Sequence, residues 1–419
     1  MDKIVVHGGN RLEGEVEASG AKNSALPLLF ASLLTDGPCR LRRVPDVADI
    51  RTARRLLETL GATVIEPARG ELLIDCSGVN RFDAPYELVR TMRASFLTLG
   101  PLLARFGRAR VSQPGGCAIG TRPVDIHLAA MTALGATVQQ EAGYVDAETD
   151  ALVGAQIVLE APSVGATENL LMAASLARGS TRVENAAREP EIVDLADALT
   201  KMGARIDGAG SSVIEIEGVE SLGGLDHEVI PDRVEVGTFM VGAAMTRGDV
   251  FVRGARAGDL QVFLEKLEES GARVSVAADG VSVATDLRPK AVDIETAPHP
   301  GFPTDLQAQF MALMCFAEGT SRVRETIFEN RFMHVPELTR MGASIRLEGH
   351  EAIVEGRVGL SGAPVMATDL RASVCLVLAA MAAENESEVL RVYHLDRGYE
   401  HIEDKLRGLG ASIERVSMV

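Results

Sequence analysis

The sequence predicts an α/β protein of six repeated units, forming two domains in which sheets lie outside a helical centre. Three observations support this. A five-residue word recurs six times, each unit reads as alternating helices and strands, and the first helix of every unit is apolar on nearly all sides. The chain has 419 residues, too many for a single hydrophobic core.

The recurring word marks the end of a helix and the start of the next strand. It reads LGATV, LGATV, MGARI, SGARV, MGASI and LGASI, with glycines at 61, 135, 203, 271, 342 and 410. These glycines lie roughly 70 residues apart, a period typical of repeat architectures. Glycine suits the left-handed position that ends a helix, and the β-branched residues after it favour a strand.

A second turn precedes each copy of the word, so that a unit reads helix, turn, strand, helix, glycine stop, strand. The turns are TDGPCRL (35–41), RFGRARV (105–111), ARGSTRV (177–183), TRGDVFV (246–252), AEGTSRV (317–323) and AENESEV (383–389). The second helix of a unit, as in DIRTARRLLETLGATV, has its apolar residues on one face. First helices such as NLLMAASLA and ASVCLVLAAMAA lack a polar face and are predicted to be buried.

Six units divide naturally into three plus three, because one unit cannot bury its own faces whereas three can close around a core. We expect a first domain over residues 21–229. We expect a second domain over residues 230–419 together with residues 1–20, whose leading strand would close that ring. Each domain would then be an inside-out α/β barrel.

The composition excludes some function classes. The net charge is −17, aromatic residues are 4% and tryptophan is absent, which disfavours non-specific binding to nucleic acid or to anionic lipid. A local cluster of basic residues could still bind a small anionic substrate. The N-terminal MDKIVVHGGN does not read as a signal peptide, and the longest apolar run of about ten residues is too short to span a bilayer. We therefore expect a cytoplasmic protein; its oligomeric state does not follow from the sequence.

Five cysteines occur, at 39, 76, 117, 315 and 375, without the spacing of metal ligands or of a redox pair. Cys315 and Cys375 lie in apolar segments predicted to be helical, and are predicted to be core residues. Cys117 differs, because it lies in VSQPGGCAIGTRPVD (111–125), a glycine-rich insertion in the second unit. Insertions on a regular scaffold often carry function. The residues alone leave open whether this thiol is incidental or reactive.

Cationic residues occur where several apolar helices begin, and helix starts attract anions. Lys22, Arg93 and Arg371 occupy such positions, in SGAKNSAL, RTMRASFL and ATDLRASV, while Arg122, Arg331 and Arg397 lie in turns. Any one of them could be a solvated charge; several converging would form a site for a polyanion.

Two aspartates, Asp305 in FPTDLQ and Asp369 in ATDLRA, also open helices. Each fits an N-cap or first-turn acid. Each also fits a general base or substrate clamp, and the proline-rich flank APHPGFPTD would hold Asp305 rigidly.

Longer stretches of the chain resemble a known family from end to end. They are SGAKNSALP, TMRASF, PGGCAIGTRPVD, SVGATEN, ENAAREPEIVD, APHPGFPTDLQAQ, ENRFMHVPELTRMGA, ATDLRAS and HLDRGYEHIEDKLRGLGA. Together they resemble the UDP-N-acetylglucosamine 1-carboxyvinyltransferases, enolpyruvyl transferases of the EPSP synthase superfamily. The resemblance implies two inside-out α/β domains with the active site in the cleft between them. It also implies transfer of the enolpyruvyl group of phosphoenolpyruvate to the 3′-hydroxyl of UDP-N-acetylglucosamine, through a tetrahedral intermediate.

The resemblance implies a role for each matching residue. Lys22 and Asn23 match phosphoenolpyruvate contacts, and Arg93, Arg122 and Arg397 match the basic groups around its phosphate and carboxylate. Residues that match UDP-N-acetylglucosamine contacts are Arg93, Arg122, Pro123, Val124, Asp125, Ile126, Ala161, Pro162, Ser163, Val164, Asp305 and Ile327. Asp369, Arg371 and Arg331 match supporting positions. Ala161 stands where family members often carry lysine, so only backbone contacts are implied there.

The implied catalytic residues are Cys117, Asp305, Lys22 and Arg397, with no metal or organic cofactor. Cys117 matches the loop cysteine proposed to protonate the methylene carbon; that cysteine also forms a covalent adduct with phosphoenolpyruvate and is the target of fosfomycin. A thiol with an ordinary pKa of about 8.5 suits an acid near neutral pH. Whether Cys117 mainly delivers a proton or assists product release stays open. Asp305 matches the residue near the reacting hydroxyl, as base or as sugar-positioning group.

Two other functions fit parts of the sequence. The sister enzyme 5-enolpyruvylshikimate-3-phosphate synthase shares the fold and the donor, although PGGCAIGTRP argues against it. A non-catalytic nucleotide-sugar binder would keep the fold, although the intact Lys22, Cys117, Asp305 and Arg397 argue against such decay.

Overall fold

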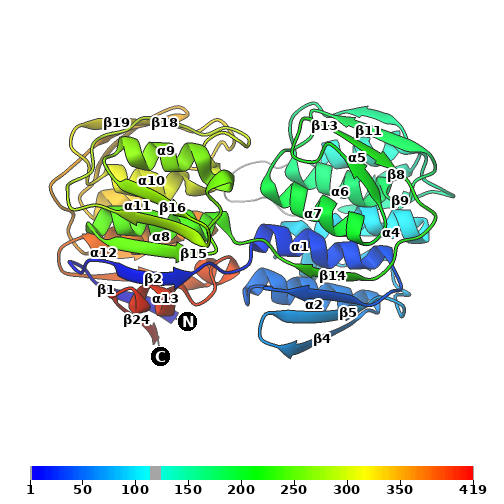
Figure 1. Ribbon diagram of the computed structural model, residues 1–419, viewed down its shortest axis with the longest axis horizontal. Helices are drawn as coiled ribbons and strands as arrows, with labels where there is room; N and C mark the ends of the chain where they lie inside the picture. The colour runs from blue at the N-terminus through cyan, green and yellow to red at the C-terminus, as the bar shows by residue number, and fades with distance from the viewer. Residues whose placement is uncertain (1, 114–123, 419) are drawn as a thin grey trace. The chain divides into compact units, whose positions relative to one another are not determined.

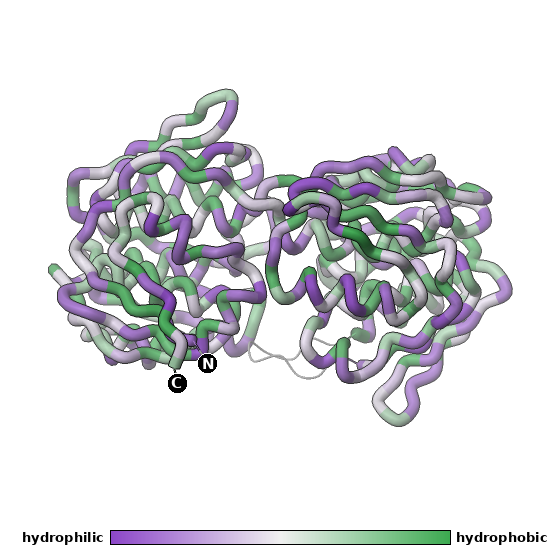
Figure 2. The backbone as a smooth tube through the Cα atoms, turned by 90° about the horizontal axis from the view of Figure 1, so that it is seen from below, coloured by the Kyte–Doolittle hydropathy of each residue, from purple (hydrophilic) through white to green (hydrophobic). Residues whose placement is uncertain are grey.

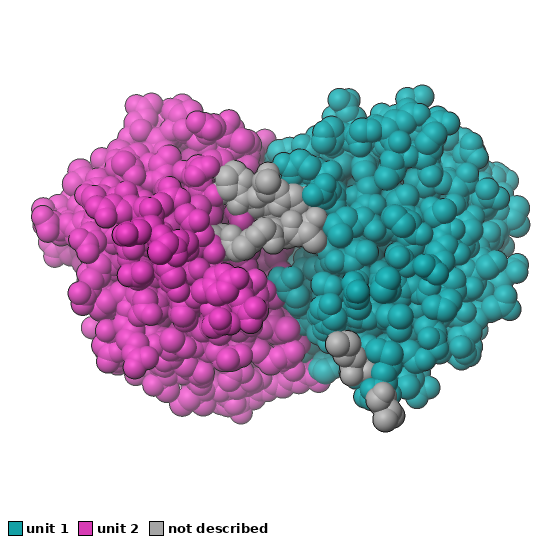
Figure 3. Space-filling model, turned by 180° about the vertical axis from the view of Figure 1, so that it is seen from behind, with its two compact units in different colours: residues 1–19, 117–121, 231–419 teal, residues 20–116, 122–230 magenta. Residues whose placement is uncertain are grey.

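The computed structural model describes residues 2–113 and 124–418, which divide into two compact units (Figure 3). The N-terminal unit holds residues 20–113 and 124–230, and the C-terminal unit holds residues 2–19 and 231–418. Each unit has its own hydrophobic core and three four-stranded sheets. The predicted α/β class, with repeated units in two domains, is confirmed.

In the N-terminal unit the sheets have the orders β14-β3-β5-β4, β6-β7-β9-β8 and β10-β11-β13-β12. Their strands are β3 (Cys39–Arg42), β4 (Thr63–Ala68), β5 (Glu71–Asp75), β6 (Asp83–Ala84), β7 (Arg108–Ser112), β8 (Thr137–Glu141), β9 (Tyr144–Glu148), β10 (Gln156–Val158), β11 (Ser180–Glu184), β12 (Arg205–Asp207), β13 (Val213–Glu217) and β14 (Leu225–Glu228). The helices are α1 (Lys22–Ala31), α2 (Ala48–Leu60), α3 (Tyr86–Val89), α4 (Leu99–Phe106), α5 (Asp125–Ala133), α6 (Val164–Ala174) and α7 (Pro190–Lys201), with 3₁₀ turns η1 (Ser32–Leu34) and η2 (Arg93–Thr98).

In the C-terminal unit the orders are β16-β17-β15-β2, β18-β19-β21-β20 and β22-β23-β1-β24. The strands are β1 (Asp2–His7), β2 (Glu13–Glu17), β15 (Asp249–Arg253), β16 (Arg273–Ala277), β17 (Gly280–Ala284), β18 (Ile294–Glu295), β19 (Thr320–Arg324), β20 (Ser344–Glu348), β21 (Glu351–Glu355), β22 (Pro364–Met366), β23 (Glu386–Leu390) and β24 (Ser412–Ser417). The helices are α8 (Arg233–Thr246), α9 (Gln261–Glu269), α10 (Gln307–Met314), α11 (Val335–Arg340), α12 (Leu370–Ala382) and α13 (Ile402–Gly408), with η3 (Ala257–Leu260), η4 (Thr304–Leu306) and η5 (Val392–Arg397).

All six sheets have one topology, in which a parallel edge pair is followed by two antiparallel pairs. The glycines of the recurring word are left-handed in every repeat, with φ of 107° at Gly61, 94° at Gly135, 108° at Gly203, 99° at Gly271, 95° at Gly342 and 97° at Gly410. A side chain is strained at such a φ, which explains why this position keeps glycine.

Within each unit the first helices of the repeats are buried, as predicted from their lack of a polar face. In the C-terminal unit α8, α10 and α12 pack against one another, and the sheets lie outside them (Figure 1). Hydrophilic and hydrophobic residues alternate along many outer strands (Figure 2), since only one face of each sheet meets the core. Cys315 and Cys375 are fully buried, and burial raises the pKa of Cys315 to about 12, so it is an unreactive core thiol.

Three strands complete sheets far from their own place in the sequence. Strand β14 pairs in parallel with β3, and β2 pairs in parallel with β15. Strand β1 lies between β23 and β24 and is antiparallel to both. The first 19 residues thus supply two strands to the C-terminal unit.

Over residues 2–113 and 124–418, none of the helices combines the length and the hydropathy that crossing a bilayer requires. In the same residues, no group of three or more histidine, cysteine, aspartate or glutamate side chains could hold a metal ion.

Candidate active site

The predicted site residues of the N-terminal unit lie at helix starts. Three further ones, Cys117, Arg122 and Pro123, lie outside the described residues. Lys22 is the first residue of α1, and its Nζ is 3.1 Å from Oδ2 of Asp49 in α2. Both side chains are more than nine-tenths buried. A cation at a helix N-terminus opposes the helix dipole, so Asp49 supplies the charge that keeps Lys22 in place.

A buried hydrogen-bonded chain joins the start of α1 to helix α7 and strand β14. The hydroxyl of Ser24 donates to Asp194 in α7, and Nε2 of His227 in β14 lies 2.8 Å from the other carboxylate oxygen of Asp194. Lys201 lies 3.0 Å from Nδ1 of His227. Since Lys201 can only donate, Nδ1 accepts and Nε2 donates to Asp194. The chain therefore fixes the position of Lys22 and Asn23, which directly precede Ser24.

The residues predicted to contact the nucleotide occupy three further helix starts. Arg93 is the first residue of η2, Val124 precedes α5, and Asp125 and Ile126 are its first residues. Ser163 caps α6 by accepting from the backbone N–H of Ala166, with Ala161 and Pro162 before it and Val164 after it. Helix α6 packs against both α5 and η2. The N-terminal unit thus brings these three segments together.

In the C-terminal unit Asp305 lies between two arginines. Nη2 of Arg331 is 2.7 Å from Oδ1 of Asp305, and Nε of Arg371 is 3.3 Å from Oδ2. The arginine side chains are 4% and 3% exposed and Asp305 is 27% exposed, so the carboxylate is the accessible member of the cluster. The structure brings together Asp305 and Arg331, which lie 26 residues apart in the fifth repeat, and Arg371 from the sixth.

Arg371 has spare hydrogen-bonding capacity. Its Nη atoms make no well-aligned hydrogen bond within the described residues, and the guanidinium interacts only loosely with Tyr399, whose hydroxyl it approaches and whose ring centre is 5.5 Å away. Burial is the largest single cause and lowers the pKa of Arg371, but Asp305, Tyr399 and Asp232 together outweigh it, so the pKa is raised overall. A charged guanidinium with two buried, loosely bonded nitrogens can bind an anion.

The two helix-opening aspartates have different roles. Asp369 is the N-cap of α12, and its Oδ1 accepts from the backbone N–H groups of Arg371 and Ala372. Asp305 is the second residue of η4, whose N-cap is Pro303, and its carboxylate pairs with Arg331 and Arg371. Arg397 is the last residue of η5. The pKa of nearby His394 is lowered, first by burial and then by the charge of Arg397.

Ile327 is held near Asp305 by a buried acid. Glu325 is 1% exposed, and its Oε1 accepts from the backbone N–H groups of Ile327 and Phe328 and from the hydroxyl of Thr296. Its Oε2 accepts from Thr304, the neighbour of Asp305, at 2.9 Å. Glu325 thus joins two segments that sequence reasoning treated separately.

Sequence reasoning missed Asp49 and Glu325. For Asp49 a signal existed, because Asp49, Ala53, Leu56 and Leu60 form one buried face of α2 and a lone acid on an apolar face needs a partner. For Glu325 no local signal existed. Two of its partners, Ile327 and Phe328, are local, but Thr296 and Thr304 are 29 and 21 residues away and only the tertiary fold brings them to it.

Gly237 in α8 controls the position of Asp305, and we expect Gly237→Ala to reduce activity. A Cβ at Gly237 would lie 2.5 Å from Cδ1 of Leu306, which is fully buried next to Asp305. We expect a loss of about 1–3 kcal/mol of stability and a fall in turnover of about tenfold to a hundredfold. Gly258→Ala is the matched control, because a Cβ there has no neighbour within 4 Å. Equal activity of the two variants would contradict this prediction.

His334, fully buried beside the site, predicts a pH dependence of stability. Burial lowers its pKa to about 4 from an ordinary value of 6.5; Arg331 reinforces this and Asp369 opposes it. The fold holds the neutral imidazole, so the stabilisation is full above pH 6.5 and is lost as the pH falls toward 4, by up to about 3 kcal/mol.

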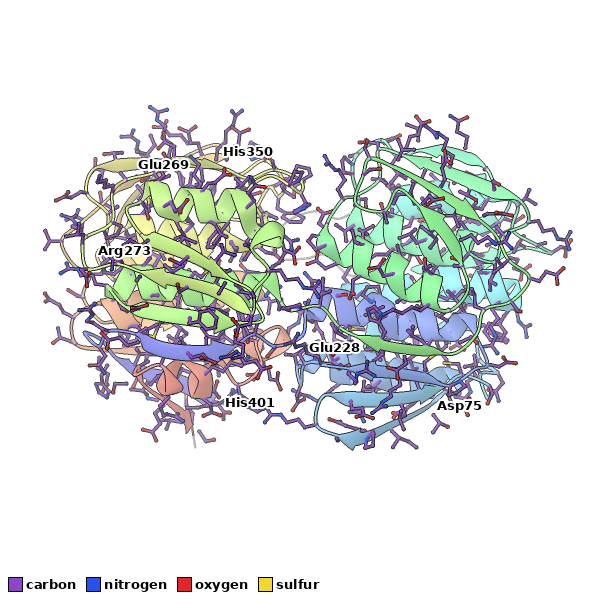
Figure 4. All side chains as sticks on the ribbon, in the orientation of Figure 1. Asp75, Glu228, Glu269, Arg273, His350 and His401 are labelled. Carbon is purple, nitrogen blue, oxygen red and sulfur yellow. The ribbon has the colours of Figure 1, made fainter. Side chains whose placement is uncertain are left out.

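We expect the urea midpoint to fall less between pH 7 and pH 4 in His334→Leu than in wild type. His350→Gln is the control, because His350 is an exposed residue in the turn between β20 and β21 (Figure 4) and should keep the wild-type slope. The same slope in all three proteins would refute the role of His334.

Comparisons with known proteins agree with this architecture. A family profile described as EPSP synthase (3-phosphoshikimate 1-carboxyvinyltransferase) matches residues 6–406. Two relatives are named UDP-N-acetylglucosamine 1-carboxyvinyltransferase, one from Geotalea uraniireducens (strain Rf4) and one from Geobacter metallireducens (strain ATCC 53774 / DSM 7210 / GS-15). They are 55% identical over 417 and 416 residues, which is 99% of this chain and 100% of each relative.

Two solved structures share the fold. The enolpyruvyl transferase NikO from Streptomyces tendae superimposes with a TM-score of 0.89 at 27% identity, covering 100% of this chain and 99% of that one. An EPSP synthase from Acinetobacter baumannii gives a TM-score of 0.75 at 20% identity over the full length of both chains, which speaks to the fold alone.

Proposed function

Because this chain belongs to the EPSP synthase family of enolpyruvyl transferases, we propose that it transfers the enolpyruvyl group of phosphoenolpyruvate to the 3′-hydroxyl of UDP-N-acetylglucosamine, releasing phosphate. The observation that carries the choice of acceptor is the 55% identity, over nearly the whole chain, to two proteins of that name. This reaction is the first committed step of peptidoglycan synthesis, and we assign the enzyme to the cytoplasm, where both substrates are made.

The reaction adds the sugar oxygen to C2 of phosphoenolpyruvate while C3 gains a proton. The tetrahedral adduct then loses phosphate and a proton from C3, which leaves an enol ether on the sugar. The enzyme must therefore supply one acid at C3, one base at the hydroxyl and cations for the phosphate and carboxylate. No redox step or external reductant enters this balance.

We assign the anionic groups of phosphoenolpyruvate to Lys22, Asn23, Arg122 and Arg397. The buried Lys22–Asp49 pair supports this for Lys22, since Asp49 holds the ammonium group at a helix start that also attracts anions. Arg371 and Arg331 support the site. The Nη atoms of Arg371 are bonded only loosely, to Tyr399, so they could accommodate a carboxylate or phosphate oxygen as a further partner.

We assign the sugar hydroxyl to Asp305 and the proton at C3 to Cys117. Asp305 is the accessible carboxylate of its cluster, and Arg331 and Arg371 hold both of its oxygens. A carboxylate held in this way is an oriented acceptor for the hydroxyl, as base or as positioning group. The nucleotide is assigned to Arg93, Arg122, Pro123, Val124, Asp125, Ile126, Ala161, Pro162, Ser163, Val164 and Ile327.

The experiment that tests this function follows phosphate release from phosphoenolpyruvate with different acceptors. We expect release with UDP-N-acetylglucosamine and none with shikimate 3-phosphate. The second acceptor is included because the matching family profile is described as 3-phosphoshikimate 1-carboxyvinyltransferase. Release with shikimate 3-phosphate alone would overturn the proposal, and tight nucleotide-sugar binding without release would identify a non-catalytic binder.

A further inference from the structure

Asn169 is not among the residues predicted to contact a substrate. It lies between the three predicted nucleotide-binding segments. It is fully buried in α6. Its Oδ1 accepts from the backbone N–H of Gly100 at 2.9 Å. Its Nδ2 lies 3.2 Å from the carbonyl oxygen of Phe96 and 2.9 Å from Nδ1 of His127. All of these partners belong to the N-terminal unit.

The orientation of this amide is fixed by its partners. A flipped amide would set its oxygen against the carbonyl of Phe96 and its NH₂ against the N–H of Gly100, and both contacts would be repulsive. The NH₂ group therefore faces His127 and donates to Nδ1. Nδ1 is then an acceptor, so the ring proton is on Nε2 and the imidazole is held neutral.

Gly100 lies in α4, directly after η2, whereas the two acceptors of the Asn169 amide belong to two different segments of the predicted nucleotide site. Phe96 lies in η2, which begins with Arg93, and His127 lies in α5, which begins with Asp125. Asn169 itself lies in α6, whose first turn carries Ser163 and Val164.

The segments meet closely around the His127 ring. Its edge packs on the ring of Phe96, with centroids 5.2 Å apart at 88°. On the α6 side, a Cβ on Gly165 would lie 3.0 Å from Cε1 of His127. A side chain at position 165 would therefore displace the imidazole, so this contact also depends on glycine.

We propose that Asn169, through His127, is a positioning residue for the nucleotide of the acceptor, because one buried amide sets the spacing of all three segments. The inference rests on the function proposed above. Asn169 touches no substrate group itself. Small errors in the spacing of binding groups cost large factors in binding, so loss of the amide should weaken nucleotide binding more than it weakens the fold.

The test compares variants by steady-state kinetics in the full chain. Asn169→Asp keeps the acceptor for Gly100 but removes both donors. His127→Gln places its polar group where Nε2 was and loses the bond to Asn169. His127→Asn places its carbonyl where Nδ1 was and keeps that bond. Thr35→Val is the matched control. The buried hydroxyl of Thr35 donates to the carbonyl oxygen of Leu222 and accepts from the backbone N–H of Gly37, and neither partner lies in the three segments.

We expect His127→Gln to raise KM for UDP-N-acetylglucosamine about tenfold, the cost of one lost buried hydrogen bond, and Asn169→Asp, which loses two, to raise it at least as much. His127→Asn and Thr35→Val should stay within about twofold, and KM for phosphoenolpyruvate should change less than about twofold throughout. If Asn169→Asp does not fold, comparing KM for UDP-N-acetylglucosamine between His127→Gln and His127→Asn is sufficient to test the inference.

Two results would overturn the inference. One is an unchanged nucleotide KM in His127→Gln with a lowered melting temperature, which marks a purely structural contact. The other is tolerance of His127→Gln with failure of His127→Asn, which marks Nε2 as the important atom. Failure of wild type to use UDP-N-acetylglucosamine would overturn the proposed function and this inference together, and wild type alone reveals it.

Discussion

Replacing Asp305 by asparagine is expected to reduce turnover by about a thousandfold, while the affinity for UDP-N-acetylglucosamine stays within about threefold of wild type. Asparagine has nearly the same shape but cannot take a proton, and it removes the charge that Arg331 and Arg371 hold between them. Phosphate release measures turnover, and calorimetric titration with UDP-N-acetylglucosamine measures affinity.

Asp259→Asn is the matched control for this variant. Asp259 is a half-buried acid in η3, which leads into α9 as η4 leads into α10. The control should keep turnover within about twofold, as surface substitutions away from a site usually do. Near-normal turnover of Asp305→Asn would remove Asp305 from the chemistry, and loss of nucleotide affinity in parallel with turnover would assign it to binding alone.

Replacing Lys22 by methionine is expected to abolish measurable turnover and also to lower stability. Methionine keeps the length of the side chain but takes the ammonium group of Lys22 away from the buried carboxylate of Asp49. Breaking a buried ion pair in this way costs about 3–5 kcal/mol, which in a unit of this size lowers the melting temperature by roughly 6–20 °C.

The double variant Lys22→Met/Asp49→Asn separates the two effects. Removing the second charge should restore most of the melting temperature, because no uncompensated charge remains, but should leave turnover as low as in the single variant. Recovery of turnover together with stability would show that Lys22 acts only through the fold. A full melting temperature in the single variant would show that Asp49 does not depend on Lys22.

The repeat could be predicted because its signals are local. A glycine after a helical segment indicates a left-handed backbone conformation at its own position. The six glycines of the recurring sequence therefore marked six helix ends correctly. The glycine of TRGDVFV serves another purpose. In this fourth repeat Arg247 is the left-handed residue, and Gly248 is needed because a Cβ there would lie 2.0 Å from the carbonyl oxygen of Leu12. Only the tertiary fold shows that approach.

The site could be predicted only in part, for a similar reason. Lys22, Asp305 and Arg371 stood out because a charge at the start of an apolar helix is unusual in the sequence itself. Asp49, Glu325 and Asn169 act through partners from other segments. Asp49 at least stands on an otherwise apolar helix face, whereas Glu325 and Asn169 carry no local sign of their role, because partners such as Thr304 and Gly100 come near them only after folding.

The placement of β1 and β2 has a consequence for biosynthesis. Residues 20–230 contain every strand of the N-terminal unit, so this unit can fold while the rest of the chain is still being translated. Strand β1 is made well before its partners and pairs with β23 and β24 only when residues 386–417 have been made. At about 5–20 residues per second this wait lasts roughly 20–80 s, during which β1 is an unpaired, partly apolar strand. The unit that contains the first residues of the chain is therefore the last to fold.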